Sequence, residues 1–276
     1  MRHQDLPDGP ILVTGGTGRL GRLVVAGLRA RGAGFRVLTR DAERAARVLG
    51  PDVALVQGDL ADVDPGGFAR IFLLSPIAPD IVEQQTALIR RAGRARILKL
   101  SGSDWTLGAS WSGNAHQRIE AALRPGDLAV RPSVWTQGAL AGMVAQLAQG
   151  DSFTSSRGPI AYIDMRDIAD AVLALLLAET WPANPPVLTG PRALDRAALA
   201  GLAAEITGRP IRGVPLSLED QAAQLATSGA SPFVQHYLGD FARLMHGDAA
   251  AAVTGTLPAL LGRPARDVAD YLREVL

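Results

Sequence analysis

The sequence predicts an α/β protein built on a doubly wound parallel sheet, followed by a smaller C-terminal α/β region. Three observations point there. Short apolar runs alternate with helical patterns through the first half of the 276 residues, a glycine-rich turn follows the first run, and the composition changes near Gly150. Apolar strands that alternate with helices are typical of a parallel sheet buried on both faces.

The first half contains the strands and helices of the expected sheet. The strands cover residues 11–13, 35–38, 53–56, 70–74, 96–100 and 128–130, and the helices cover residues 19–30, 42–49, 79–92 and 112–123. Each strand is a short aliphatic run, such as Ile11-Leu12-Val13. Each helix repeats apolar residues at helical spacing, as Leu20, Leu23 and Val24 do.

The second half begins with an apolar helix at residues 164–179, which is expected to pack back on the sheet. A short strand at 185–190, a helix from the Asp195 cap to Thr207 and a strand at 211–215 follow. Ser217 then begins another helix in the Ser-x-x-acid form. These patterns divide the chain into residues 1–150 and 151–276.

Composition excludes several classes of site. The chain has no cysteine, so it holds no disulfide, iron–sulfur cluster or zinc–thiolate site. The histidines are scattered at His3, His116, His236 and His246, and we expect no metal. A net charge of +1 does not indicate the strongly basic surface that nucleic-acid binding needs. The apolar run 171–178 is too short to span a membrane, and the polar residues 1–10 lack a signal-peptide core, which predicts a cytoplasmic protein.

A glycine-rich turn, Val13-Thr14-Gly15-Gly16-Thr17-Gly18-Arg19-Leu20-Gly21, joins the first strand to the first helix. This spacing allows a tight turn, close approach of backbone N–H groups to a pyrophosphate, and close packing of the helix on the sheet. The phosphates then lie at the positive end of the helix. The alternative is an ordinary turn. The residues expected to hold a dinucleotide are Gly15, Thr17, Gly18, Arg19, Leu20 and Gly21.

The second strand ends in Thr39-Arg40, where an acidic residue would bind the 2′-hydroxyl of NAD. An arginine suits the 2′-phosphate of NADP(H) instead, and Arg19 could reach the same group. Asp41 either disfavours a phosphate or caps the next helix. Arg40 is alternatively a solvated arginine at a strand end. The pattern favours NADP(H) over NAD(H), with Thr39 and Arg40 at the adenosine end.

Further motifs follow in order along the chain. They are Gln57-Gly58-Asp59-Leu60, Leu73-Leu74-Ser75-Pro76, Leu100-Ser101-Gly102, His116-Gln117-Arg118-Ile119-Glu120, Val130-Arg131-Pro132-Ser133, Asp164-Met165-Arg166-Asp167-Ile168-Ala169 and Leu188-Thr189-Gly190-Pro191. With the glycine turn, this set resembles the NmrA-like family of atypical short-chain dehydrogenase/reductases, which includes quinone and triphenylmethane reductases.

The resemblance implies an NADP(H)-binding Rossmann domain, residues 1–150, and a smaller substrate-binding region, residues 151–276. It also implies that Asp59 and Leu60 lie at the adenine and that Leu74, Ser75 and Pro76 lie along the cofactor. For Asp59, a helix cap is the alternative reading.

Most short-chain reductases supply a proton through Tyr-x-x-x-Lys, and this chain lacks that motif. Four residues after Tyr162, Tyr237 and Tyr271 stand Arg166, Phe241 and Val275, and the single lysine, Lys99, lies in a predicted strand. His116 and Glu120 instead lie one turn apart on the helix after the fifth strand. They form either an acid–carboxylate pair or a structural contact, so His116 is a weak candidate for a catalytic residue and the catalytic group is not identified.

Trp105, Trp111 and Trp135 follow the fifth and sixth strands, near the strand ends where ligands bind in open α/β sheets. With His116 they line the expected pocket of a flat small-molecule substrate, or else they pack loops together. The leading hypothesis is an NADPH-dependent reductase of an electron-poor acceptor, such as a quinone, an iminium ion or a conjugated alkene, which takes hydride with little help from an acid. The alternatives are a non-catalytic, redox-sensing NADP(H)-binding regulator and a biosynthetic isomerase or cyclase on the same fold.

Overall fold

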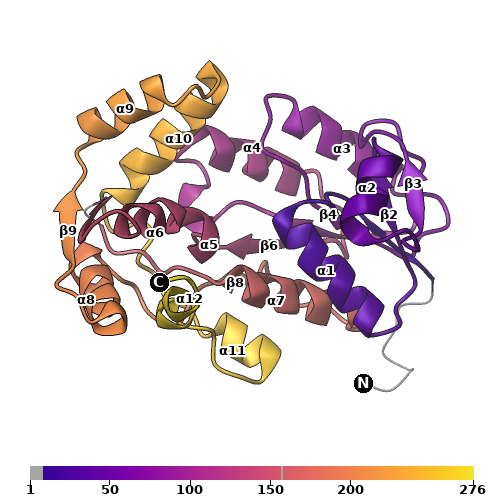
Figure 1. Ribbon diagram of the computed structural model, residues 1–276. Coiled ribbons are helices and arrows are strands. Elements are labelled where there is room, and N and C mark those ends of the chain that lie inside the picture. Colours follow the sequence, from indigo (N-terminus) through magenta and orange to yellow (C-terminus); the bar gives the residue numbers. More distant parts are fainter. Residues whose placement is uncertain (1–8, 157) are drawn as a thin grey trace. The chain divides into compact units, whose positions relative to one another are not determined.

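A computed structural model describes residues 9–156 and 158–276 (Figure 1). His3 and most of the N-terminal stretch used above lie outside the described residues. The strands are β1 (Ile11–Val13), β2 (Phe35–Thr39), β3 (Leu55–Gln57), β4 (Arg70–Leu73), β5 (Arg96–Leu100), β6 (Leu128–Pro132), β7 (Ser152–Ser155), β8 (Val187–Leu188) and β9 (Arg212–Pro215). The helices are α1 (Arg19–Ala30), α2 (Ala42–Leu49), α3 (Ile81–Arg91), the 3-10 helix η2 (Asp104–Thr106), α4 (Trp111–Glu120), α5 (Thr136–Ala139), α6 (Ala141–Leu147), α7 (Met165–Leu177), α8 (Arg196–Thr207), α9 (Leu218–Thr227), α10 (Pro232–Met245), α11 (Thr256–Leu261) and α12 (Val268–Val275).

The large sheet has the strand order β3-β2-β1-β4-β5-β6-β8, and its pairs from β3 to β6 are parallel. This confirms the predicted α/β fold with a doubly wound parallel sheet. The register aligns the carboxyl ends of three strands, because Val13 of β1 pairs with Phe72 of β4 and Leu73 of β4 pairs with Lys99 of β5. Chain segments that follow β1, β4 and β5 therefore leave the sheet at one edge.

Local chemistry explains where the helices begin and how closely they pack. The Asp41 and Asp195 carboxylates accept hydrogen bonds from the first turns of α2 and α8, as predicted for Asp195. Figure 1 shows α1 and α7 side by side. A Cβ on Gly27 of α1 would lie 2.2 Å from a methyl carbon of Leu173 of α7, so a larger residue there would require Leu173 to shift. Within the described part of the chain, none of the helices has the length and apolar character that a membrane crossing needs.

The chain forms two compact units that alternate along the sequence. The first unit comprises the described residues up to Ser101, Ala115–Arg131 and Ile168–Pro186, and the second comprises Gly102–Asn114, Pro132–Asp167 and Val187–Leu276. The first unit therefore contains β1 to β5 and most of α7, while the second contains the helices from α8 onwards.

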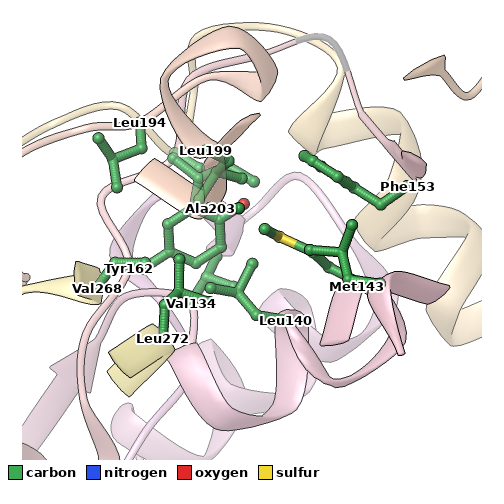
Figure 2. Close-up of a cluster of buried hydrophobic side chains, with 13 residues drawn as sticks. Val134, Leu140, Met143, Phe153, Tyr162, Leu194, Leu199, Ala203, Val268 and Leu272 are labelled. Atoms are coloured by element: carbon green, nitrogen blue, oxygen red, sulfur yellow. The ribbon is translucent and has the colours of Figure 1, made fainter. Parts of the chain in front are cut away.

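The second unit has its own apolar core, shown in Figure 2. Tyr162, Phe153 and Met143 pack there against α8 and α12 side chains such as Leu199 and Leu272. The short strands β7 and β9 pair in parallel beside it. Strand β7 has no counterpart among the predicted strands, because Ser-Phe-Thr-Ser contains one apolar residue, Phe153, and shows no apolar run.

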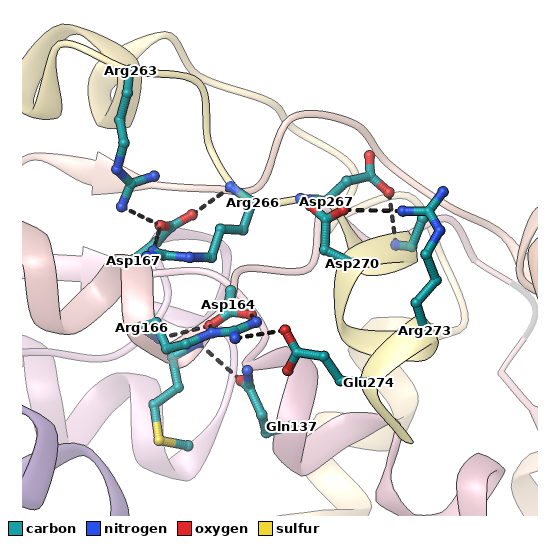
Figure 3. Close-up of polar contacts among 12 residues, drawn as sticks. Gln137, Asp164, Arg166, Asp167, Arg263, Arg266, Asp267, Asp270, Arg273 and Glu274 are labelled. Atoms are coloured by element: carbon teal, nitrogen blue, oxygen red, sulfur yellow. Dashed lines mark hydrogen bonds and ion pairs between the residues drawn. The ribbon is translucent and has the colours of Figure 1, made fainter. Parts of the chain in front are cut away.

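Buried carboxylates tie the C-terminal segment of the second unit to the start of α7 (Figure 3). Asp167 is fully buried and accepts hydrogen bonds from the Arg263 side chain and from the backbone and side chain of Arg266. Asp164 is bound by Arg166, which also reaches Glu274 of α12. Burial by itself raises the pKa of Asp164, but the hydrogen bonds from Arg166 outweigh it and hold that pKa below its ordinary value.

Candidate functional site

The glycine turn has two glycines that the fold itself requires. Gly15 has a positive φ of 64°, and a Cβ there would lie 2.7 Å from the carbonyl oxygen of Leu74. A Cβ on Gly21 would lie 2.1 Å from the carbonyl oxygen of Gly15. Gly18 is different, because the nearest atom to a Cβ there is the same oxygen at 3.3 Å. The space in front of Gly18 is therefore open.

The N-terminus of α1 suits an anion. Gly18 is its N-cap and supplies no side-chain acceptor, and the first turn carries no acidic residue, so no side chain of that turn competes with an anion for the leading N–H groups. Arg19 is exposed and Thr17 is half-buried, while the Leu20 side chain is buried in the core. Leu20 can therefore offer a ligand only its backbone. The turn fits a dinucleotide pyrophosphate, which needs backbone donors and no side chain in its way.

Leu74, the first residue after β4, lies against this turn, and the contact of Leu74, Ser75 and Pro76 with a cofactor stays a prediction. The Thr14 hydroxyl donates to the Leu74 carbonyl at 2.7 Å and accepts from the Leu74 N–H at 2.8 Å. Gln85 of α3, which is buried, donates to the Ser75 hydroxyl at 2.8 Å. Thr14 and Gln85 were missed by sequence reasoning. Thr14 therefore joins the ends of β1 and β4, and Gln85 holds the following residue against α3.

The residue after β2, Arg40, is an exposed cation. The Arg40 side chain is 82% exposed, and its nearest acidic partner is Asp59 at 3.9 Å. Asp41 caps α2 by accepting the Arg44 N–H at 2.9 Å, as the capping alternative for that residue predicted. The Thr39 hydroxyl contacts the Asp41 backbone. A guanidinium held only loosely at this position remains available to a phosphate.

The predicted adenine residues follow β3. One Asp59 oxygen accepts the Ala61 N–H at 3.2 Å in a local turn, and no helix begins among the described residues between β3 and β4, so the helix-cap alternative is wrong. Leu60 is buried, and its carbonyl accepts a hydrogen bond from Arg91 of α3 at 3.3 Å. Contact between these residues and a cofactor stays a prediction.

The structure corrects the expected partnership of His116. Among the described residues, His116 and Glu120 form no hydrogen bond with each other. The Glu120 carboxylate instead accepts hydrogen bonds from Ser101 and, at 2.6 Å, from Arg131. His116 Nδ1 lies 2.8 Å from the amine nitrogen of Lys99. Glu120 therefore pairs with Ser101 and Arg131, from neighbouring strand ends. In the described part of the chain, it forms neither an acid–carboxylate pair nor a structural hydrogen bond with His116.

Lys99 is 0% exposed in the middle of the sheet and also donates to the Leu100 carbonyl at 3.1 Å. Burial lowers the pKa of Lys99 from 10.5 to about 7, although the charge of Glu120 raises it in part. Burial, and then the charge of Lys99, lower the pKa of His116 from 6.5 to about 2. The imidazole is therefore neutral across the physiological range.

The three predicted pocket tryptophans belong to the second unit. Trp105 packs edge-on against Phe241 with ring centroids 5.3 Å apart, and Trp111 packs the same way against Phe233 at 4.7 Å. Both phenylalanines lie on α10. Trp135 precedes α5, is half-buried and bridges to Ile163. These contacts show aromatic packing inside the second unit, and the role of the indoles in a pocket stays a prediction.

Lys99 is the site residue that sequence reasoning set aside. Lys99 lies in a predicted strand and not four residues after a tyrosine, so the Tyr-x-x-x-Lys pattern excludes it. The signal was present, however, because a lysine between Leu98 and Leu100 interrupts a run that is otherwise apolar, and all 27 other basic residues are arginine. A buried amine needs a partner, and the next helix supplies the imidazole.

Sequence comparisons identify relatives over nearly the full chain. The chain is 30% identical over 288 residues to a (4-alkanoyl-5-oxo-2,5-dihydrofuran-3-yl)methyl phosphate reductase of Streptomyces griseus, covering 96% of this chain and 97% of that protein. It is 29% identical over 278 residues to an NAD(P)H azoreductase of Xenophilus azovorans, covering 95% and 96%. The sequence profile of the NmrA-like family matches residues 7–99, which include the glycine turn and the segment after β4.

Solved structures share the fold. The triphenylmethane reductase of Citrobacter sp. superposes with a TM-score of 0.83 at 18% identity, covering 97% of this chain and 99% of that chain. The NADPH-dependent quinone oxidoreductase QOR2 of Escherichia coli, in complex with NADPH, gives 0.85 at 21% identity, covering 96% and 99%. The fold, the glycine turn and a relative 30% identical from end to end agree with the predicted family: the chain belongs to the NmrA-like family.

Proposed function

We propose that the protein is an NADPH-dependent reductase that transfers hydride to a small, flat, electron-poor acceptor, such as a quinone, an iminium ion or a conjugated alkene. The open glycine turn at the end of β1, with an exposed arginine at the end of β2, carries this proposal. The reductase and azoreductase names of the full-length relatives support the reaction class. The chain lacks Tyr-x-x-x-Lys, so the proposed reaction does not use that proton relay.

The residues of the first unit would hold the cofactor by its phosphates. Gly18 leaves room for the pyrophosphate against the N-terminus of α1, and Arg40 would pair with the 2′-phosphate. The Thr14–Leu74 contact keeps the turn and the segment after β4 in fixed relation. When bound, NADPH supplies the hydride; the chain supplies orientation and exclusion of water.

The direct test follows the absorbance of NADPH while the protein is mixed with a quinone, a triphenylmethane dye, an azo dye and a conjugated enone. Oxidation of NADPH that depends on one of these acceptors supports the proposal. Tight NADPH binding without turnover of any acceptor would favour a binding regulator. A substrate that rearranges with no net consumption of NADPH would favour an isomerase.

Replacing Arg40 with alanine is expected to weaken NADPH about ten- to a hundredfold, which corresponds to about 1.5–3 kcal/mol for a lost charge-assisted contact. NADH lacks the 2′-phosphate, so its affinity should hardly change. Titration calorimetry with both cofactors measures the difference. Arg36→Ala is the matched control, because Arg36 is an exposed arginine earlier on the same strand. Equal losses for both cofactors would contradict the assignment.

Replacing Trp135 with alanine is expected to raise the KM for the acceptor several-fold, because an aromatic wall of the pocket is lost. The affinity for NADPH should stay unchanged. Trp181→Ala provides the control: that indole donates to the Leu175 carbonyl at 2.6 Å and faces Arg96, so its loss should lower Tm without changing KM. Steady-state kinetics with the best acceptor distinguishes the two, and an unchanged KM for Trp135→Ala would remove this residue from the pocket.

A further inference from the structure

The amine of Lys99 and the imidazole of His116 form a buried pair that the proposed function leaves unused. Lys99 is fully enclosed, His116 is 7% exposed, and 2.8 Å separates Nζ from Nδ1. An amine in the middle of a sheet is costly to bury, so its retention calls for an account. An apolar residue at position 99 would serve the sheet better if packing were the whole purpose.

The contacts of Lys99 fix the tautomer of His116. An ammonium group has donors and no acceptor, and here it donates to the Leu100 carbonyl and to Nδ1 of His116. Nδ1 must then be the acceptor, which places the imidazole proton on Nε2. Within the described residues, the Nε2–H finds no hydrogen-bond partner. The pair thus ends in a fixed donor on a side chain that is nine-tenths buried.

Lys99 lies on an interior strand, one residue before the carboxyl end of β5, and the glycine turn follows the carboxyl end of β1. Lys99 stands in register with Leu73, one residue before the segment 74–76, and Leu74 contacts the glycine turn. The other registered neighbour of Lys99 is Ala129, on β6. The charged and titratable groups that face the Lys99 amine are therefore His116 and Glu120, both on α4.

We propose that His116 donates the proton that follows hydride transfer. Lys99 orients the His116 imidazole and supplies it with a replacement proton. This inference rests on the proposed function. The bound cofactor would supply the hydride, and the anion that a quinone or a conjugated alkene then becomes would take the proton from His116 Nε2; an iminium ion becomes a neutral amine and needs no proton. At the same time, Nδ1 takes a proton from the Lys99 ammonium, so the imidazole returns to a neutral state. To reset the pair, Nε2 takes up a proton from solvent and Nδ1 returns its proton to the amine of Lys99, which is itself fully enclosed.

The shifted pKa values agree with this arrangement. An ammonium with a pKa of about 7 releases a proton readily near neutral pH, whereas an ordinary lysine does not. The neutral imidazole, with its pKa lowered to about 2, acts by passing a proton from Nδ1 to Nε2 and never as a stable cation. The rate of acceptor reduction should therefore fall as pH rises through about 7, when Lys99 loses its proton.

The first experiment measures the unliganded protein by NMR of the imidazole nitrogens, with His116→Gln used to assign the signals. We expect His116 to remain neutral from pH 8 down to about pH 4, and to carry its proton on Nε2 below about pH 7, where Lys99 is an ammonium. This readout needs neither cofactor nor acceptor. An Nδ1-protonated ring below about pH 7, or a ring that titrates near its ordinary value, would overturn the proposal.

The second experiment compares pH profiles of kcat for the whole enzyme with its best acceptor. His116→Gln is expected to lower kcat about a hundredfold, the low end for loss of a general acid, with NADPH affinity unchanged. Lys99→Met, which keeps an apolar fit, should lower kcat about tenfold or more and remove the fall above about pH 7. Lys99→Arg should also remove that fall, because an arginine does not titrate there.

The matched control is Arg70→Met. Arg70 is another buried cation, on the neighbouring strand β4, and it donates to the Leu176 carbonyl at 2.5 Å, but it lies at the opposite end of its strand. Its loss should lower Tm and keep the pH profile. A profile for folded Lys99→Met that matches wild type would overturn the relay while leaving the reductase intact. Failure of the wild type to reduce any acceptor would instead overturn the proposed function.

Discussion

Replacing Gly18 with valine is expected to abolish NADPH binding and leave the protein folded. The backbone of Gly18, with φ −72° and ψ 169°, is one that any L-residue adopts, so the change introduces no backbone strain. A Cβ there meets only the Gly15 carbonyl oxygen at 3.3 Å, which a small shift accommodates. The branched side chain would, however, fill the space that a pyrophosphate needs at the start of α1. We expect at least a hundredfold loss of affinity, about 2.7 kcal/mol or more.

A melting curve and a cofactor titration on the same sample test this prediction. Gly201→Val is the control for adding a side chain, because a Cβ on Gly201 meets nothing within 4 Å. Gly21→Val is the contrasting case: its Cβ would lie 2.1 Å from the Gly15 oxygen, so Tm itself should fall. If Gly18→Val binds NADPH as wild type does, the turn serves the fold alone.

Replacing Asp167 with alanine is expected to destabilise the second unit by about 3–5 kcal/mol. The fully buried carboxylate receives the Arg263 and Arg266 side chains and the Arg266 N–H, and its removal leaves these donors without their shared acceptor. Both arginines are about one-third exposed, so water offsets part of the loss and the lower end of that range is expected.

Urea unfolding followed by circular dichroism measures the change in the free energy of unfolding. Asp151→Ala is the matched control, because its ion pair with Arg209 is exposed on both sides and should contribute less than about 1 kcal/mol. If Asp167→Ala loses no more stability than Asp151→Ala, the buried carboxylate does not anchor the C-terminal segment.

The regular part of the fold could be predicted from sequence because its signals are local. Apolar runs placed β1, β4 and β5, and the Asp195 cap and Gly208 bound α8 as expected. The third strand was displaced, from the predicted 53–56 to Leu55–Gln57, because pairing with Val37-Leu38-Thr39 decides which residues join the sheet. That pairing is a tertiary fact which no local pattern contains.

The site divides in the same way. Glycines at fixed spacing predicted the turn, because a side chain at Gly15 or Gly21 would clash with the backbone and the sequence must therefore keep glycine there. The pairing of Lys99 with His116 left a weaker mark, because it joins a strand to the following helix across 17 positions. Helical spacing suggested a contact between His116 and Glu120, but the Glu120 carboxylate pairs with Arg131 of β6. Competition among distant partners decides such contacts, and helical spacing alone does not.

The alternation of the two units along the chain has a consequence for biosynthesis. A ribosome that has synthesised the strands β1 to β5 has not yet made α7, whose Leu173 packs on Gly27 of α1. The first residue of the second unit's core is Val134, and the core is complete only when Leu272 of α12 has been added. Neither unit can finish folding as an early, separate product of translation. A nascent chain stalled shortly before α12 should therefore remain open to proteases in its second unit, and synthesis and release of α12 should protect it.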